Sequence, residues 1–315
     1  MFIPVSGITV IRPLVMGFML VVLLMTTLGA EAGGTTYEVP LDGDIHAVID
    51  EAESGDTILL MAGVYELTST IDPAGKSITL LGATDSSGAP ASILDGGHID
   101  GTKSGIRILI CQSGEQSDTT FQNLVIQNGY DHDCGGGMSN KSFSKPTLKN
   151  CTFQNNIAGN SGGGIHNDSD GELTLKNCRF DGNHAAEGGA IYSKRGALNL
   201  MDCDFTGNTS EETGGAIHLF ANRSLILGCK FNLNTTEDEG GALYCDTSET
   251  EIDGCMFTAN SADSGGGASA YKGSFTSTNS TYSKCQAGIY GGALNVRYVT
   301  GRSAADRFWT TTPGR

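Results

Sequence analysis

Cys151-Thr-Phe-x-x-Asn156 is the first of five copies of one short pattern, and the later copies begin at Cys178, Cys203, Cys229 and Cys255. Successive copies are 25 to 27 residues apart. A fixed period in this range is typical of stacked units, each of which buries its apolar face only against its neighbours. Because each period contains short strand-like runs rather than helical patterns, we expect each unit to be one coil of a β-solenoid.

A second signature repeats with the same period. Two glycines and a small residue precede one apolar position in every coil, at Met138, Ile165, Ile191, Ile217, Leu243, Ala268 and Leu294. The two signatures together predict an all-β fold, a single-stranded parallel β-helix of about ten coils. A short helix is expected to cap its N-terminal end, because Ile45, Val48, Ile49 and Ala52 fall on one helical face after the candidate cap Asp44.

The repeated cysteines and asparagines are interpreted as structural ladders. Residues i and i+2 of a strand point the same way, so Cys and Phe of Cys-x-Phe face the interior together. Adjacent coils are ~4.8 Å apart, whereas a disulfide needs Cβ atoms ~3.8 Å apart. Stacked free thiols are therefore favoured, with coil-to-coil disulfides as the alternative. The second ladder should hydrogen-bond along the axis through Asn156, Asn183, Asn208, Asn234 and Asn260.

The chain divides into four segments. Residues 1–32 are interpreted as a signal peptide, because Arg12 precedes an apolar run from Leu14 to Leu28, and Ala30-Glu31-Ala32 fits a cleavage site. An uncleaved anchor is the alternative; after cleavage no transmembrane span is expected. Residues 33–120 are assigned to the cap and the first irregular coils, and residues 121–298 to the regular repeats. Residues 299–315 are expected to be an irregular tail, either truncated or naturally disordered.

The repeats resemble a known family. Phe-x-x-Asn paired with Gly-Gly-Ala-Ile, over about residues 121–295, resembles the repeats of chlamydial-type polymorphic outer membrane proteins. The start, with Gly55-Asp-Thr-Ile, Gly63-Val-Tyr65 and Ser77-Ile-Thr-Leu-Leu81, looks like the entry coils of the pectate-lyase-like class of right-handed parallel β-helices. The resemblance implies a right-handed coil and a secreted or surface-exposed protein with a role in adhesion or cell-envelope contact.

One column of residues is a candidate binding site. The position after each apolar residue of the glycine signature should face solvent, and it holds His166, Tyr192, His218 and Tyr244. Two residues earlier, an outward column of small residues is expected at Gly164, Ala190, Ala216 and Ala242. Flat rings beside small residues suit a sugar chain or an extended peptide, although rings that only stack on each other to protect the sheet are the alternative.

A catalytic reading has weaker support. Arg179, Asp204 and Lys230 follow one another on the outer face, as a lyase base beside a carboxylate would, but alternating charges also form plain cross-strand pairs. A calcium site needs several carboxylates together, and this column supplies one. No metal or other cofactor is therefore expected, and Ca²⁺ enters only with the lyase alternative.

The sequence thus favours a secreted or surface-exposed, non-catalytic β-helix with a structural, adhesive or ligand-binding role. Its expected partner is an extracellular glycan or a surface protein. The formal charge of −16 argues against nucleic acid as a partner. The alternative function is a carbohydrate-active enzyme of the pectate-lyase type, a polysaccharide lyase or hydrolase.

Overall fold

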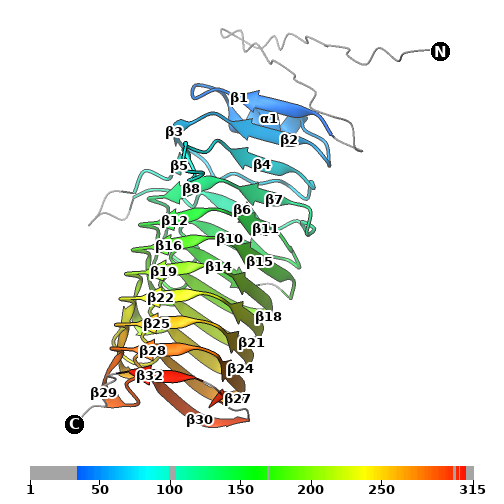
Figure 1. Cartoon of the computed structure of the whole chain (residues 1–315). Helices are drawn as coiled ribbons and strands as arrows, with labels where there is room; N and C mark the ends of the chain where they lie inside the picture. Colours follow the sequence, from blue (N-terminus) through cyan, green and yellow to red (C-terminus); the bar gives the residue numbers. More distant parts are fainter. Residues whose placement is uncertain (1–33, 99–103, 169, 301–302, 305, 310–315) are drawn as a thin grey trace, which may run out of the picture.

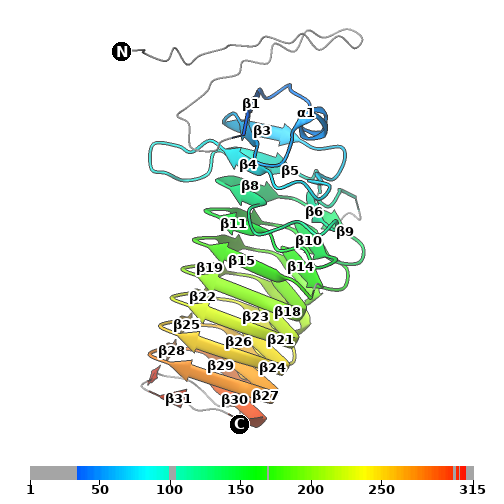
Figure 2. The ribbon, with the colours of Figure 1, turned by 90° about the vertical axis from the view of Figure 1, so that its right-hand side faces the viewer.

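The computed structural model describes residues 34–98, 104–168, 170–300, 303–304 and 306–309, so the expected signal peptide lies outside the described residues. The chain forms a right-handed parallel β-solenoid of about nine turns. Its strands stack into three parallel sheets along the rod, and the third of them begins only at Tyr130 (Figures 1 and 2). This confirms the fold predicted from the period.

The first sheet is the largest, with 15 strands. One row of it comprises β1 (Thr36–Val39), β2 (Thr57–Leu60), β4 (Thr79–Gly82), β7 (Thr120–Gln122), β11 (Thr147–Lys149), β15 (Glu172–Lys176), β18 (Ile191–Met201), β21 (Ile217–Leu227), β24 (Leu243–Asp253), β27 (Ala268–Thr278) and β30 (Leu294–Thr300). The remaining strands are β6 (Leu109–Cys111), β10 (Met138–Lys141), β14 (Ile165–Asp168) and β31 (Ser303–Ala304). Strands β6, β10 and β14 pair with one another in a second row of this sheet. Strand β14 then pairs with the first half of β18, so the two rows join in the long strands from β18 onward.

Two smaller sheets form the other sides of the rod, the third only from Tyr130 onward. The second sheet contains β3 (Gly63–Glu66), β5 (Ser92–Asp95), β8 (Leu124–Gln127), β12 (Thr152–Gln154), β16 (Arg179–Asp181), β19 (Asp204–Thr206), β22 (Lys230–Asn232), β25 (Met256–Thr258), β28 (Thr281–Ser283) and β32 (Arg307–Trp309). The third contains β9 (Tyr130–Asp131), β13 (Ile157–Ala158), β17 (His184–Glu187), β20 (Thr209–Thr213), β23 (Thr235–Thr236), β26 (Ser261–Ser264) and β29 (Gln286–Tyr290).

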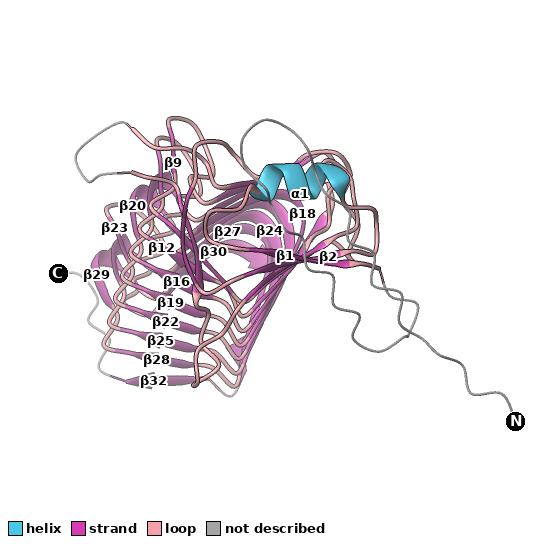
Figure 3. Cartoon of the chain, turned by 90° about the horizontal axis from the view of Figure 1, so that it is seen from above, coloured by secondary structure: helices cyan, strands magenta, loops and turns pink. Residues whose placement is uncertain are grey.

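The expected cap is present at the N-terminal end. Helix α1 (Ile45–Glu51) begins after Asp44, whose carboxylate accepts hydrogen bonds from the backbone N–H groups of His46 and Ala47. Ile45, Val48 and Ile49 are buried. The helix lies at the N-terminal end of the rod, next to β1 (Figures 1 and 3).

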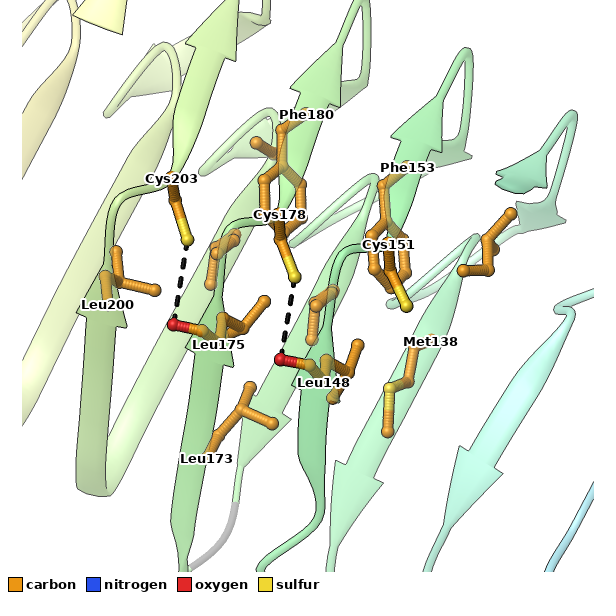
Figure 4. Packing of buried hydrophobic residues seen from close by; sticks show 14 of the residues in the cluster. Met138, Leu148, Cys151, Phe153, Leu173, Leu175, Cys178, Phe180, Leu200 and Cys203 are labelled. Carbon is orange, nitrogen blue, oxygen red and sulfur yellow. Dashed lines mark hydrogen bonds between the residues drawn. The ribbon is translucent and has the colours of Figure 1, made fainter. Parts of the chain in front are cut away.

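The core is a stack of identical side chains. Phe153, Phe180, Phe205, Phe231 and Phe257 are fully buried, and neighbouring rings are 4.6–5.0 Å apart and nearly parallel. Cysteines line the same interior (Figure 4). The thiol of Cys178 is 3.7 Å from the carbonyl oxygen of Leu148, and that of Cys203 is 3.7 Å from that of Leu175. These two thiols therefore contact carbonyl groups of the preceding coil.

All nine cysteines lie within the described residues, and each is a free thiol. The repeated ones, Cys151, Cys178, Cys203, Cys229 and Cys255, are buried. Burial raises the pKa of the Cys178 thiol well above its ordinary value, so the reactive thiolate is suppressed there.

The repeated asparagines form a continuous chain of hydrogen bonds. The side-chain oxygen of Asn208 accepts from both the backbone N–H and the amide of Asn183, at 3.0 and 2.9 Å. Its own amide donates to the Phe180 carbonyl and to Asn234. The same arrangement joins the fully buried Asn156, Asn183, Asn208, Asn234 and Asn260. Every coil is thereby fixed to the next, because an unsatisfied buried amide is costly.

The described part of the segment expected to be an irregular tail contains strands. Strand β30 runs to Thr300, and β31 and β32 continue the first and second sheets. The column substitutions in this region remain compatible with the stack. Ser280 replaces the ladder cysteine and accepts the backbone N–H of Cys255, while Cys285 lies at the ladder position after Asn260. The solenoid therefore continues through β31 and β32, beyond the boundary at residue 298 that the sequence pattern indicated.

Candidate ligand-binding face

The ring-bearing column occupies the first sheet. His166, Tyr192, His218 and Tyr244 are the second residues of β14, β18, β21 and β24, and they pair in register across these strands. We call these four residues the ribbon. Strand alternation places them on the side of the sheet opposite the Ile and Leu positions that fill the core.

The expected exposure of the ribbon is wrong. His166, Tyr192 and His218 are buried, and Tyr244 is half-buried. The cover comes from the turns that lead into the first sheet. A Cβ atom added at Gly135 would lie 3.2 Å from that of His166, and the Thr213 hydroxyl is 2.9 Å from Nδ1 of His218. The alternation of a strand predicts the side of the sheet on which a residue lies. It does not predict whether a neighbouring turn covers that residue.

The rings also do not form a stacking platform. The rings of His166 and Tyr192 are 5.4 Å apart and parallel, and His218 meets Tyr192 and Tyr244 edge to face. Ring faces are thus occupied by other ribbon rings along the axis.

The small-residue column predicted beside the ribbon lies inside the molecule. Ala190, Ala216 and Ala242 are fully buried members of the core. A Cβ at Gly164 would lie 3.2 Å from the ring of Phe180. These positions are small because the phenylalanine stack occupies the space opposite them, so they do not flank the ribbon on the surface.

The turns before the ribbon require glycine. Gly188 and Gly214 have positive φ values of 60° and 65°. A Cβ at either position would lie 2.3 Å from the carbonyl oxygen of Ile191 or Ile217. This geometry explains the repeated glycine signature and brings each turn close against the ribbon.

Burial keeps the ribbon uncharged around neutral pH. It lowers the pKa of His166 to about 4 and that of His218 to about 3. It raises the pKa of Tyr192 and of Tyr244 to about 12, with nearby carboxylates adding to the shift. Glu187, whose pKa burial also raises, lies 4.0 Å from Nδ1 of His218. The ribbon side chains therefore keep one protonation state around pH 7. Such groups can form hydrogen bonds, but they are poor general acids or bases.

Three polar atoms along this column are buried without a protein partner. They are the hydroxyl of Ser139, Nδ1 of His166 and Nε2 of His218. For His218 the tyrosine rings on both sides meet the imidazole edge to face, which allows a weak N–H contact with a ring face. Ser139 and His166 pair directly in register, so two unsatisfied polar atoms belong to neighbouring strands.

A second outward column was missed by the sequence reasoning. It lies two residues beyond the ribbon in each strand, and Lys194, Phe220, Asp246 and Tyr271 in it are half-buried rather than buried. We call the full set the outer column: Lys141, Asp168, Lys194, Phe220, Asp246, Tyr271 and Arg297. The available signal was the same period applied two residues further along each strand.

Charges of the outer column are balanced locally. Asp168 is paired with Arg195 at 2.7 Å, and Arg297 is paired with Glu239. The ammonium group of Lys194 lies 5.9 Å from the centre of the Phe220 ring, and the guanidinium of Arg297 lies 5.5 Å from that of Tyr271. Cations therefore lie over the accessible rings, with carboxylates close by.

The column proposed for a lyase carries ordinary surface ion pairs. Arg179 pairs with Asp181 of its own strand at 2.7 Å, and Lys230 pairs with Asp204 at 3.4 Å. Both arginine and lysine are exposed, where such pairs contribute little to stability. In the part of the chain that the structure describes, no three His, Cys, Asp or Glu side chains gather in a way that could hold a metal ion.

Comparison with known families identifies the class of protein. The model of the right-handed β-helix region matches residues 104–297, and the chain belongs to this family. No curated protein matches the sequence. Among the described residues, none of the helices has the length and apolar character needed to cross a membrane.

Solved structures with a similar course of the chain include enzymes. Pectate lyase Pel9A is 14% identical with a TM-score of 0.47, over 89% of this chain and 78% of its own. The pectin methylesterase of Aspergillus niger is 14% identical with a TM-score of 0.46, and the match covers 90% of this chain and 88% of the esterase. ORF18 of Geobacillus virus E2 is 16% identical with a TM-score of 0.46, and the 86% of this chain that matches it spans 61% of its length. Likenesses at this level say nothing of activity.

Proposed function

We propose that this protein is a secreted or surface-exposed β-helix that binds an extended extracellular ligand on its first sheet and performs no chemistry of its own. The binding surface is the outer column together with the half-buried Tyr244 of the ribbon. The observation that carries the proposal is the row of half-buried aromatic and charged side chains along strands held in register. Extended ligands suit such a surface, because each coil presents the same backbone at a constant spacing.

The non-catalytic reading is supported by the ribbon's titration. A general acid or base works best with a pKa near the working pH, whereas His218 and Tyr192 have pKa values of about 3 and about 12. Arg179, the candidate base of the lyase alternative, is held by Asp181 on the second sheet, away from the ribbon. The resemblance of the repeats to polymorphic outer membrane proteins supports an adhesive role at the cell envelope.

A binding screen on immobilised glycans and extracellular proteins tests the proposal. The wild type is compared with Asp246→Arg, which reverses a charge in the middle of the face, and with Asp204→Arg, which makes the same change on the second sheet. We expect binding to at least one extracellular polymer that Asp246→Arg reduces and Asp204→Arg leaves intact. Equal effects of the two variants, or release of cleaved products from the bound polymer, would contradict the proposal.

A further inference from the structure

We propose that this protein assembles head to tail, with the C-terminal end of one rod docked on the N-terminal end of a second copy. The head is the end formed by residues 34–66, which include β1, α1 and β3, and the tail is the end that carries residues 284–309, with β29, β30 and β32. The two ends lie at opposite extremes of the rod (Figures 1 and 2). This inference goes beyond the proposed function and does not depend on it.

The apolar core is open at the tail. Leu219, Cys245, Ala270 and Val296 pair in register along the first sheet, so their side chains point to the same side of it. The first three are at most 1% exposed, whereas Val296 is 45% exposed. The column that fills the core therefore reaches the tail without a further coil of the described chain to cover it. Burying this surface against a partner is favourable, because it removes apolar area from water.

Strand edges are free at both ends. Within the described residues, β30 pairs only with β27, β29 only with β26 and β32 only with β28. At the head, β1 pairs only with β2 and β3 only with β5. The backbone N–H and C=O groups along such edges are available to another strand. Head and tail belong to the same stack of parallel strands, so two rods can meet end to end with matching strand directions.

Exposed apolar side chains are concentrated at the same two ends. The exposed large hydrophobic residues of the tail are Ile289, Tyr290, Val296 and Tyr298. Those of the head are Leu41, Met61 and Val64. The long middle of the described chain adds only Phe143, Leu233 and Met256. Exposed apolar residues that gather in this way mark contact surfaces, and here they indicate one contact surface at each end of the rod.

Complementary charges identify the occupant of the tail as the head of a second copy. The head contains eight Asp or Glu residues and no Lys or Arg, whereas the tail contains four Lys or Arg residues and one acid. Arg297 is paired with Glu239, which leaves Lys284 and Arg307 as exposed cations of the described tail. Opposite charges favour contact of a head with a tail, and like charges disfavour contact of two heads or of two tails.

A head-to-tail contact joins two different surfaces at opposite ends of a rod. Such a heterologous contact does not close after two copies, so it produces an open filament. Filament length should therefore grow with protein concentration. Added salt should shorten the filaments, because it screens the attraction between exposed charges of the two ends.

Analytical ultracentrifugation of the purified protein over a range of concentrations tests the proposal. The tail variant combines Val296→Asp with Arg307→Glu, and the head variant combines Asp50→Lys with Glu51→Lys. Lysines suit the last turn of α1, so the head variant should keep its helix. Each variant should weaken self-association on the order of a hundredfold. Met256→Asp is the matched control, since Met256 is 48% exposed on the second sheet away from both ends, and it should leave association unchanged.

Mixing the two variants distinguishes a head-to-tail contact from every other one. The tail variant keeps an intact head and the head variant keeps an intact tail, so an equimolar mixture should form heterodimers and nothing larger. A head variant that still dimerises alone would show contact between two tails and overturn the proposal. Wild type that stays monomeric at every concentration, or assembly that neither variant weakens, would overturn it as well. Circular dichroism of each variant verifies that the coil stack is intact, and none of these results bears on the proposed ligand-binding face.

Discussion

Replacing Asn208 by alanine should remove most of the stability of the regular coils. The change leaves three buried groups without their partner on Asn208: the backbone N–H and the side-chain amide of Asn183, and the carbonyl of Phe180. The side-chain oxygen of Asn234 keeps its bond from the backbone N–H of residue 208. Asn208 is fully buried, so water does not replace these bonds. At about 1–3 kcal/mol for each buried group left unpaired, three groups give a loss of ~3–9 kcal/mol in the free energy of unfolding.

Urea unfolding followed by far-ultraviolet circular dichroism measures this loss. Asn199→Ala is the matched control, because Asn199 lies in the same coil but outside the core, with its amide bonded to Glu172. Its loss should stay within about 0.5 kcal/mol, as for most surface changes. If Asn208→Ala costs no more than Asn199→Ala, the asparagine chain does not hold the coils together, and the account of the ladder is wrong.

Three further predictions concern the cysteines, the buried His218 and the lyase alternative. Thiol titration of denatured, unreduced protein should find most of the nine cysteines free; finding only one would show that disulfides form despite the coil spacing. Acid should destabilise the fold through His218: its pKa is about 3 when folded against 6.5 ordinarily, so the unfolded state binds the proton first, and stability falls by up to ~1.4 kcal/mol per unit as pH drops from 6.5 toward 3. A shallower pH dependence for His218→Gln in urea titrations checks this, and an identical one contradicts it. With Ca²⁺ present, the protein should release no unsaturated products from polygalacturonate; activity that Arg179→Ala abolishes without loss of stability would restore the lyase alternative.

The sequence predicted the fold because the solenoid repeats one local rule. The Cys-x-Phe pattern fixes which side of each strand is buried, and the constant period stacks Phe153 on Phe180 and each later ring on the one before. The cap was predictable for a similar reason, since Asp44 and the apolar face of Ile45, Val48 and Ile49 are local signals.

The candidate site was less predictable because exposure depends on neighbouring coils. Alternation placed His166 and His218 on the outer side of the sheet, but the glycine turns and Thr213 cover them. The small column at Ala190 was assigned to the surface although the turn before it points the side chain at the core. Phe220 and Tyr271 were overlooked because they alternate with Lys194 and Asp246 and so form no uniform column in the sequence.

Carboxylate footprinting with and without the extracellular polymer identified in the binding screen tests the central claim most directly. A water-soluble carbodiimide labels accessible carboxyl groups, and peptide mass spectrometry reads the labelling at each position. The account predicts that the bound polymer protects Asp246 on the first sheet, while Asp204, which lies on the second sheet, is labelled equally in both states. Protection of Asp204 with unchanged labelling of Asp246 would contradict the assignment of the binding face.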